Sequence, residues 1–165
     1  MRSVIAVYVE NKFGVLTRVA GLFMRKGFNI DSLAVGETED PHFSRMTITL
    51  RGEESAREQI INQLKKLHNV KEVKLLSDGE TVERELLLVK VRNTPETRTE
   101  IMTAADVYRG KIIDYSTDSM VIEVTGEPLK IQAFIDVMQP VGIMEMCRTG
   151  IVALSRGADV LSVKE

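Results

Sequence analysis

Residues 3–23, SVIAVYVENKFGVLTRVAGLF, contain the stretch that decides the fold. The run from Val4 to Val9 is apolar on both alternating faces, which is typical of a central β-strand with neither face turned to water. From Leu16 the apolar residues recur at helical spacing, and Gly27 ends that pattern. The sequence therefore predicts a strand that leads directly into a helix through the loop Glu10 to Leu16.

The loop between this strand and this helix has the chemistry of a small-ligand site. The first N–H groups of a helix lack intrahelical partners, and the helix dipole adds partial positive charge there. Gly14 has no Cβ, so a ligand can approach the N–H groups of Val15 and Leu16 closely. Asn11 adds an amide that both donates and accepts, as a zwitterion requires. These residues alone leave two interpretations open: an anion- or amino-acid-binding loop, and an Asx-type helix start with nothing bound.

The remainder of the first half completes a recognisable order of elements. Strands are predicted from Asn29 to Thr38 and from Arg45 to Arg51, and a third strand from Val70 to Leu76. Between them Ser55 and Glu58 form a capping box at the start of a second amphipathic helix. A βαββαβ order with short connections gives a four-stranded antiparallel sheet with both helices on one face, the ferredoxin-like plan.

The second half repeats this order. Its predicted elements are a strand from Leu86 to Val91, a helix opened by Thr94-Pro95, a hairpin of Lys111 to Ser116 and Ser119 to Thr125, a helix over Ile131 to Met138, and a strand from Ile143. We therefore predict an α+β chain of two ferredoxin-like βαββαβ units, with domains at 1–76 and 83–165 joined by a polar linker at 77–82. Residues 158–165 are expected to be a frayed terminus.

One feature of the first half predicts association between chains. The first strand offers apolar residues to both faces of its sheet, whereas the two helices cover only one face. We expect a second copy or another subunit to cover the other face, and hence a homodimer through the first halves. At the position of the Gly14 loop the second half has Asn93-Thr94-Pro95, so only the first half is predicted to bind a ligand.

The composition restricts the classes of function. Lys and Arg number 22 against 24 Asp and Glu, a net charge of −2, which predicts neither a nucleic-acid partner nor an anionic membrane surface. No apolar run approaches the length of a membrane span, and we expect a cytoplasmic protein. Two histidines and one cysteine give no metal-ligand spacing, and Cys147 is interpreted as a buried structural thiol.

Three other functions on this fold find little support in the residues. The acidic turn Glu37 to Asp40 could ligate a cation, but a solvated turn is favoured and no metal is assigned. An RNA-recognition fold needs aromatic residues on its central strands, where only Tyr8 could serve. An acylphosphatase-like hydrolase is the enzymatic alternative, yet no phosphate loop with a paired arginine is evident between Val9 and Leu16. We assign no catalytic residue.

Several short motifs resemble one family across nearly the whole chain. They are Asn11-x-x-Gly14-Val15-Leu16-x-Arg18-Val19, Gly21-Leu22-Phe23, Gly27-x-Asn29-Ile30-x-Ser32-Leu33, Ser44-Arg45-Met46-Thr47, Arg84-Glu85, Leu88-Val89-Lys90, Phe134 and Leu154-Ser155-Arg156-Gly157. This pattern resembles the acetohydroxyacid synthase (acetolactate synthase) small subunits, whose N-terminal unit is an ACT domain.

The resemblance implies a function without catalysis in this chain. It implies a regulatory subunit of branched-chain amino-acid synthesis that activates a catalytic large subunit and lets valine, or a related branched-chain amino acid, inhibit it. Thiamine diphosphate, FAD and Mg are expected in that partner and no cofactor in this chain. The alternative is a stand-alone ACT-type amino-acid-binding protein that regulates a different metabolic enzyme.

The resemblance also implies where the amino acid binds. In similar proteins it lies between paired ACT domains, held by the loop that matches Asn11, Gly14, Val15 and Leu16 of one chain. The strand start that matches Asn29 and Ile30 of the other chain completes the site. The residue chemistry agrees, because two amides supply donors and acceptors while Val15 and Ile30 can offer an apolar wall.

Overall fold

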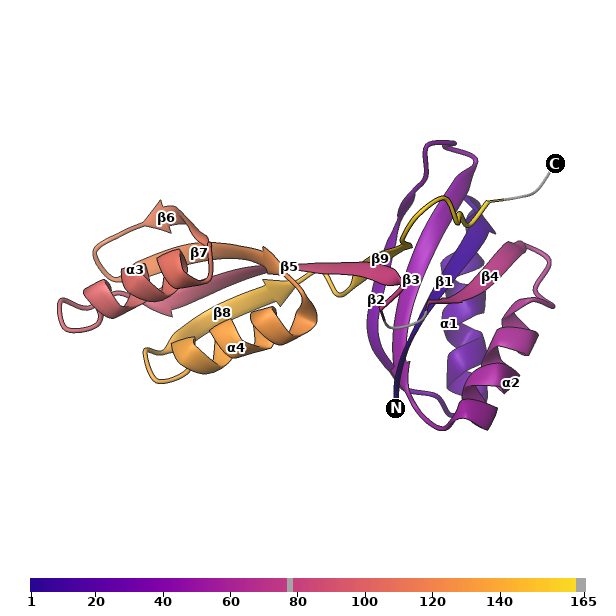
Figure 1. Ribbon diagram of the computed structural model, residues 1–165, viewed down its shortest axis with the longest axis horizontal. Coiled ribbons are helices and arrows are strands. Elements are labelled where there is room, and N and C mark those ends of the chain that lie inside the picture. Colours follow the sequence, from indigo (N-terminus) through magenta and orange to yellow (C-terminus); the bar gives the residue numbers. More distant parts are fainter. Residues whose placement is uncertain (77–78, 163–165) are drawn as a thin grey trace. The chain divides into compact units, whose positions relative to one another are not determined.

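The computed structural model describes residues 1–76 and 79–162 and divides into two compact units (Figure 1). The first unit is Met1–Val82 together with the chain from Ile151 onward, and the second is Glu83–Gly150. Both units show the predicted βαββαβ order and antiparallel sheets, so the α+β, ferredoxin-like fold is confirmed. Among the described residues, no helix has the length and apolar character needed to cross a membrane.

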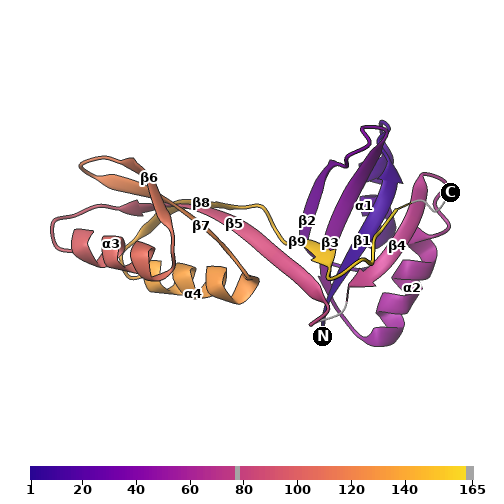
Figure 2. The ribbon, with the colours of Figure 1, turned by 45° about the horizontal axis from the view of Figure 1, so that its top comes forward.

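The first unit is a four-stranded sheet in the order β2-β3-β1-β4, with α1 and α2 packed on one face (Figures 1 and 2). Every neighbouring pair of strands is antiparallel. Its elements are β1 (Arg2–Glu10), α1 (Val15–Arg25), β2 (Ile30–Glu37), β3 (Phe43–Arg51), α2 (Glu54–Leu64) and β4 (Val70–Leu76).

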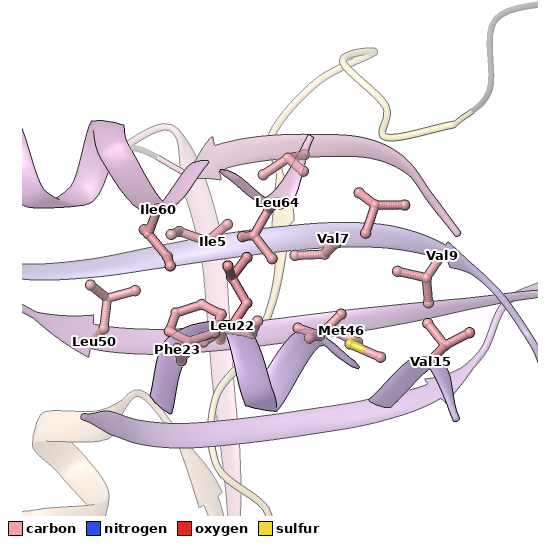
Figure 3. Packing of buried hydrophobic residues seen from close by; sticks show 14 residues of the cluster. Ile5, Val7, Val9, Val15, Leu22, Phe23, Met46, Leu50, Ile60 and Leu64 are labelled. Atoms are coloured by element: carbon pink, nitrogen blue, oxygen red, sulfur yellow. The ribbon is translucent and has the colours of Figure 1, made fainter. Parts of the chain in front are cut away.

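Alternate residues of β1 build the core beneath the helices. Ile5, Val7 and Val9 are at most 1% exposed and pack with side chains of both helices, among them Phe23 and Leu64 (Figure 3). Because successive side chains of a strand point to opposite faces, the other three apolar residues of β1 face away from the helices. The prediction of a strand buried on both faces is confirmed.

The second face of β1 is covered by the C-terminal segment of the same chain. Ile151, Ala153 and Leu161 form a buried cluster with the outward-facing residues of β1, which are Val4, Ala6 and Tyr8. Arg45 of β3 fastens this segment, because its Nη2 donates to the carbonyl of Ala153 at 2.7 Å. The expectation that a second copy or another subunit covers this face is therefore wrong.

The same segment corrects the predicted terminus. Residues up to Ser162 are described, and Leu161 is only 9% exposed. Asp159 pairs with Lys74 of β4. A segment held by a buried leucine and an ion pair is not frayed. We therefore call Ala158 to Ser162 the C-terminal strap of the first unit. Val163 to Glu165 lie outside the described residues.

The second unit has a sheet in the order β6-β7-β5-β8, and β9 pairs with β5. Helices α3 and α4 lie on one face of that sheet (Figure 1). The elements are β5 (Thr81–Arg92), α3 (Arg98–Val107), β6 (Lys111–Tyr115), β7 (Ser119–Gly126), α4 (Pro128–Met138) and β8 (Ile143–Arg148). Strand β9 (Val152–Ser155) belongs to the segment from Ile151 that is part of the first unit. Beneath the helices, buried residues such as Leu87, Val89, Ile101 and Phe134 form its core.

The domain boundaries differ from those predicted. Thr81 and Val82, placed in the linker 77–82, begin β5, while Ser77 and Asp78 of that linker lie outside the described residues. The predicted domain 83–165 also loses its last part, because the chain from Ile151 returns to the first unit. Sequence patterns are local, so they did not show that this tail packs on a strand some 150 residues earlier.

Two local predictions fail for identifiable reasons. Helix α2 begins at Glu54 after an extended Glu53, so Ser55 lies inside the helix and no side-chain cap forms there. Cys147 is exposed rather than buried, because β8 is an edge strand and Cys147 pairs with the half-exposed outward-facing Leu88.

Candidate functional site

Gly14 sits at the junction between β1 and α1 in a left-handed conformation, with φ of 83°. The first intrahelical bond runs from the N–H of Arg18 to the carbonyl of Gly14 at 3.1 Å. The N–H of Val15, predicted to be a free donor, donates to the carbonyl of Lys12 at 3.4 Å. Among the described residues, the N–H groups of Leu16 and Thr17 have no hydrogen-bond partner, and the first turn of α1 contains no acidic side chain. The helix therefore presents unpaired donors to solvent beside a glycine that adds no side chain.

Asn11 belongs to the same loop as these donors and is held by the β2–β3 hairpin. Its backbone N–H donates to the carbonyl of His42 at 2.7 Å. Its Nδ2 donates to the carbonyl of Pro41 at 3.0 Å and to Oε1 of Glu37 at 3.1 Å. Two acceptors around Nδ2 fix the orientation of the amide. Its Oδ1 accepts no hydrogen bond from any described residue, so one acceptor stays available.

The loop has negative charge on the side of Glu37 and partial positive charge at the start of α1. The carboxylate of Glu37 places negative charge beside the free carbonyl oxygen of Asn11. The start of α1 supplies partial positive charge and free N–H groups. An α-amino acid carries one ammonium and one carboxylate, so the two sides complement its two charged groups.

The acidic turn that could have held a cation is occupied by internal contacts. Glu37 contacts Asn11, while Oδ1 of Asp40 accepts the N–H of His42 at 3.0 Å and lies 2.7 Å from its Nδ1. These hydrogen bonds lower the pKa of Asp40, with the backbone N–H as the largest cause. Within the described ranges no group of three potential metal ligands occurs.

The apolar residues of the loop divide between core and surface. Val15 is only 4% exposed and its side chain belongs to the core of the first unit, so it does not form an open wall. Leu16 is 44% exposed, and the side chain of Phe13 is fully exposed. The apolar surface beside the loop therefore comes from Leu16 and Phe13, the second of which the sequence had not singled out.

Asn29 and Ile30 lie at the opposite end of the sheet. Val9, at the end of β1, pairs with Ser44 of β3, whereas Ile30, at the start of β2, pairs with Leu50. Six positions along a strand correspond to about 20 Å, at roughly 3.4 Å per residue. The structure thus brings Asn11, Gly14, Val15 and Leu16 together, and one chain cannot add Asn29 and Ile30 to them.

The sequence also missed a polar network behind the loop. Glu10, the last residue of β1, contacts Lys71 at 2.8 Å and Lys12 at 3.0 Å, and accepts from Asn69 at 2.8 Å. These contacts lower the pKa of Glu10 to about 2, with Lys71 as the largest cause. Asn69 also reaches Arg18 of α1. No periodic signal marks such residues, because their partners come from distant parts of the chain.

The fold and this loop define a class: ACT-type chains, in which a ferredoxin-like unit carries an open strand-to-helix loop. Residues 5–72 match the family described as the AHAS small subunit-like ACT domain, and residues 84–157 match the small subunit of acetolactate synthase. This chain belongs to the acetolactate synthase small-subunit family.

Individual relatives align with this chain over almost its full length. The chain is 52% identical to a probable acetolactate synthase small subunit of Archaeoglobus fulgidus over 157 residues, 95% of this chain and 98% of that protein. It is 48% identical to the acetolactate synthase small subunit of Mycolicibacterium smegmatis, covering 93% of this chain and 90% of that one. The crystal structure of the acetolactate synthase small subunit of Thermotoga maritima superposes with a TM-score of 0.89 at 41% identity, covering 96% and 99% of the two chains.

Proposed function

We propose that this chain is the regulatory subunit of an acetolactate synthase: it raises the activity of a catalytic large subunit and makes that activity sensitive to valine or a related branched-chain amino acid. The membership of the small-subunit family supports this assignment. The observation that carries it is a single loop that holds both the free Oδ1 of Asn11 and the unpaired N–H groups that begin α1.

These groups suit the two charged ends of an amino acid. The ammonium donates to Oδ1 of Asn11 next to the carboxylate of Glu37, and the carboxylate accepts from the N–H groups of Leu16 and Thr17. A branched aliphatic side chain would then contact apolar surface such as Leu16, which is 44% exposed. The open space around Gly14 leaves room for the ligand backbone.

The complete site is proposed to form between two chains. Strand β2 is an edge of its sheet, so its outer backbone groups are free to pair with another strand. Two copies related by a twofold axis would pair these edges antiparallel, which sets the start of one β2 against the end of the other. Asn29 and Ile30 of one chain would then lie near the Asn11 loop of its partner, and each dimer would hold two equivalent sites.

Catalysis is assigned to the large subunit. Thiamine diphosphate, FAD and Mg are proposed to bind there, and this chain supplies regulation only. Its isolated form is expected to have no synthase or phosphatase activity.

The test is reconstitution of the cognate large subunit with and without this chain. Acetolactate formation is expected to rise on addition of the chain and to fall on titration with valine, with leucine and isoleucine compared in parallel. No change in rate on addition would contradict the assignment and favour an ACT-type sensor for another enzyme. Turnover by the purified chain alone would contradict its non-catalytic role.

A further inference from the structure

We propose that Asn69 is a positioning residue for the amino-acid loop: it ties the strand before the loop to the helix after it, and thereby fixes the geometry in which Asn11 and the start of α1 receive a ligand. This inference rests on the proposed function for the identity of the ligand. Asn69 itself does not touch Asn11 or Gly14 through any hydrogen bond among the described residues.

The first tie runs to the strand end. The backbone N–H of Glu10 donates to the carbonyl of Asn69 at 2.9 Å, and Nδ2 of Asn69 donates to Oε2 of Glu10 at 2.8 Å. The register between β1 and β4 shifts after Tyr8, and Val9 pairs with Val70. Asn69, which precedes β4, is thereby brought beside Glu10, the residue that immediately precedes Asn11.

The second tie runs to the helix. Nη1 of Arg18 donates to Oδ1 of Asn69 at 2.5 Å. The backbone N–H of the same arginine donates to the carbonyl of Gly14 at 3.1 Å. A shift of Asn69 therefore acts on the first turn of α1, where the unpaired N–H groups lie.

The chemistry of the position explains why an asparagine serves there. Its amide donates to a carboxylate and accepts from a guanidinium at the same time, which no apolar or singly charged side chain of this size can do. Asn69 is only 7% exposed, and hydrogen bonds are stronger in such surroundings. The loop itself is largely exposed at Asn11, Lys12 and Phe13, so packing does little to hold it.

The principal experiment compares the wild-type chain with Asn69→Ala. Hydrogen exchange of the backbone amides of residues 12–17 is measured without ligand, and the valine Kd by calorimetry. We expect exchange of this segment to rise by about tenfold and the valine Kd to increase by about tenfold, as the loss of both side-chain hydrogen bonds implies. If Asn69→Ala does not fold, Arg18→Leu removes the helix tie alone and is expected to give part of both effects.

A swap of functional groups tests the tie directly. In Asn69→Asp combined with Glu10→Gln, the amide and the carboxylate exchange places, and the aspartate can still accept from Arg18. We expect Asn69→Asp alone to weaken valine binding, because two carboxylates then face each other, and the double variant to recover most of the affinity. Failure of the second substitution to restore any affinity would overturn the proposed tie.

The matched control lies in the other unit. Asn93 is 3% exposed, donates to the carbonyl of Ser116 at 2.6 Å and accepts from Nε of Arg98 at 3.0 Å. Asn93→Ala removes the same kind of buried amide, and it should leave both the exchange of residues 12–17 and the valine Kd unchanged.

Two results distinguish the inference from the function on which it rests. Unchanged exchange of residues 12–17 in a folded Asn69→Ala chain would overturn the positioning role, whether or not valine binds. Increased exchange in that variant, with no valine binding to the wild type, would leave the positioning role intact and contradict the proposed function instead.

Discussion

Asn11 and Asn93 immediately follow the first strand of their respective units and make the same pair of hydrogen bonds. Each donates its backbone N–H to a carbonyl of the following hairpin, His42 at 2.7 Å and Asp118 at 3.0 Å. Each also donates Nδ2 to a second carbonyl of that hairpin, at 3.0 Å for Asn11 and 2.6 Å for Asn93. The two units thus use one amide in one way to join a strand end to a hairpin.

The two amides differ in their carbonyl oxygens. Oδ1 of Asn93 accepts from Nε of Arg98, whereas Oδ1 of Asn11 has no donor among the described residues. In the second unit a cationic side chain already occupies the place that an ammonium would take. We therefore predict one amino-acid site per chain, in the first unit. Calorimetric titration with valine should give a stoichiometry near one, and two sites per chain would contradict this reading of Arg98.

The second prediction concerns charge at Gly14. An added Cβ there meets nothing within 4 Å, but φ of +83° strains any residue other than glycine. Asn and Asp tolerate this conformation best and should cost about 1 kcal/mol of stability alike. Gly14→Asp should abolish valine inhibition by repelling the ligand carboxylate, while Gly14→Asn should retain part of it. If Gly14→Asp and Gly14→Asn lost valine inhibition to the same extent, backbone strain rather than charge would be responsible.

A third prediction tests whether the site is shared between chains. Gly14→Asp and Asn29→Ala should each weaken valine binding in homodimers. In a mixed dimer one site carries both substitutions and the other carries neither. When the two variants are refolded together, each mixed dimer should therefore contain one site that binds valine with wild-type affinity. Absence of recovery, although mass spectrometry shows mixed dimers, would place the whole site within one chain.

The fourth prediction concerns the C-terminal strap. Leu161 is 9% exposed within the cluster on the outer face of β1, so Leu161→Ala should destabilise the first unit by about 2 kcal/mol. Leu154 is 61% exposed, and Leu154→Ala should change stability by less than about 0.5 kcal/mol. Chemical denaturation measures both. Equal stabilities for the two variants would mean that the strap contributes little to the fold.

The fifth prediction concerns pH and Glu10. Its pKa is lowered from 4.5 to about 2 in the folded chain, by Lys71 first and then Lys12 and Asn69. A carboxyl with a depressed folded pKa stabilises the fold above its unfolded pKa, and this contribution is lost as the pH falls from about 4.5 towards 2. Denaturation curves of wild type and Glu10→Gln should therefore converge over this window. A constant difference in stability between them would contradict the role of ionised Glu10.

Local patterns in the sequence determined most of the fold. The continuous apolar run of β1, the helical spacing after Leu16 and the repetition of one element order predicted both ferredoxin-like units. These signals are local because side-chain direction in a strand or helix follows from backbone geometry alone. The loop with Asn11 and Gly14 was found for the same reason, since a glycine between a strand and a helix is visible in a few residues.

Contacts between distant residues were decided only by the tertiary structure. The strap over β1, the exposure of Cys147 and the network from Asn69 to Glu10 and Arg18 each depend on which segments meet in space. Hydrophobic burial has no direction, so an apolar face on β1 specifies that a cover is needed and leaves open which chain supplies it. A hydrogen bond needs its donor and acceptor within about 3 Å, and that proximity is a property of the folded chain.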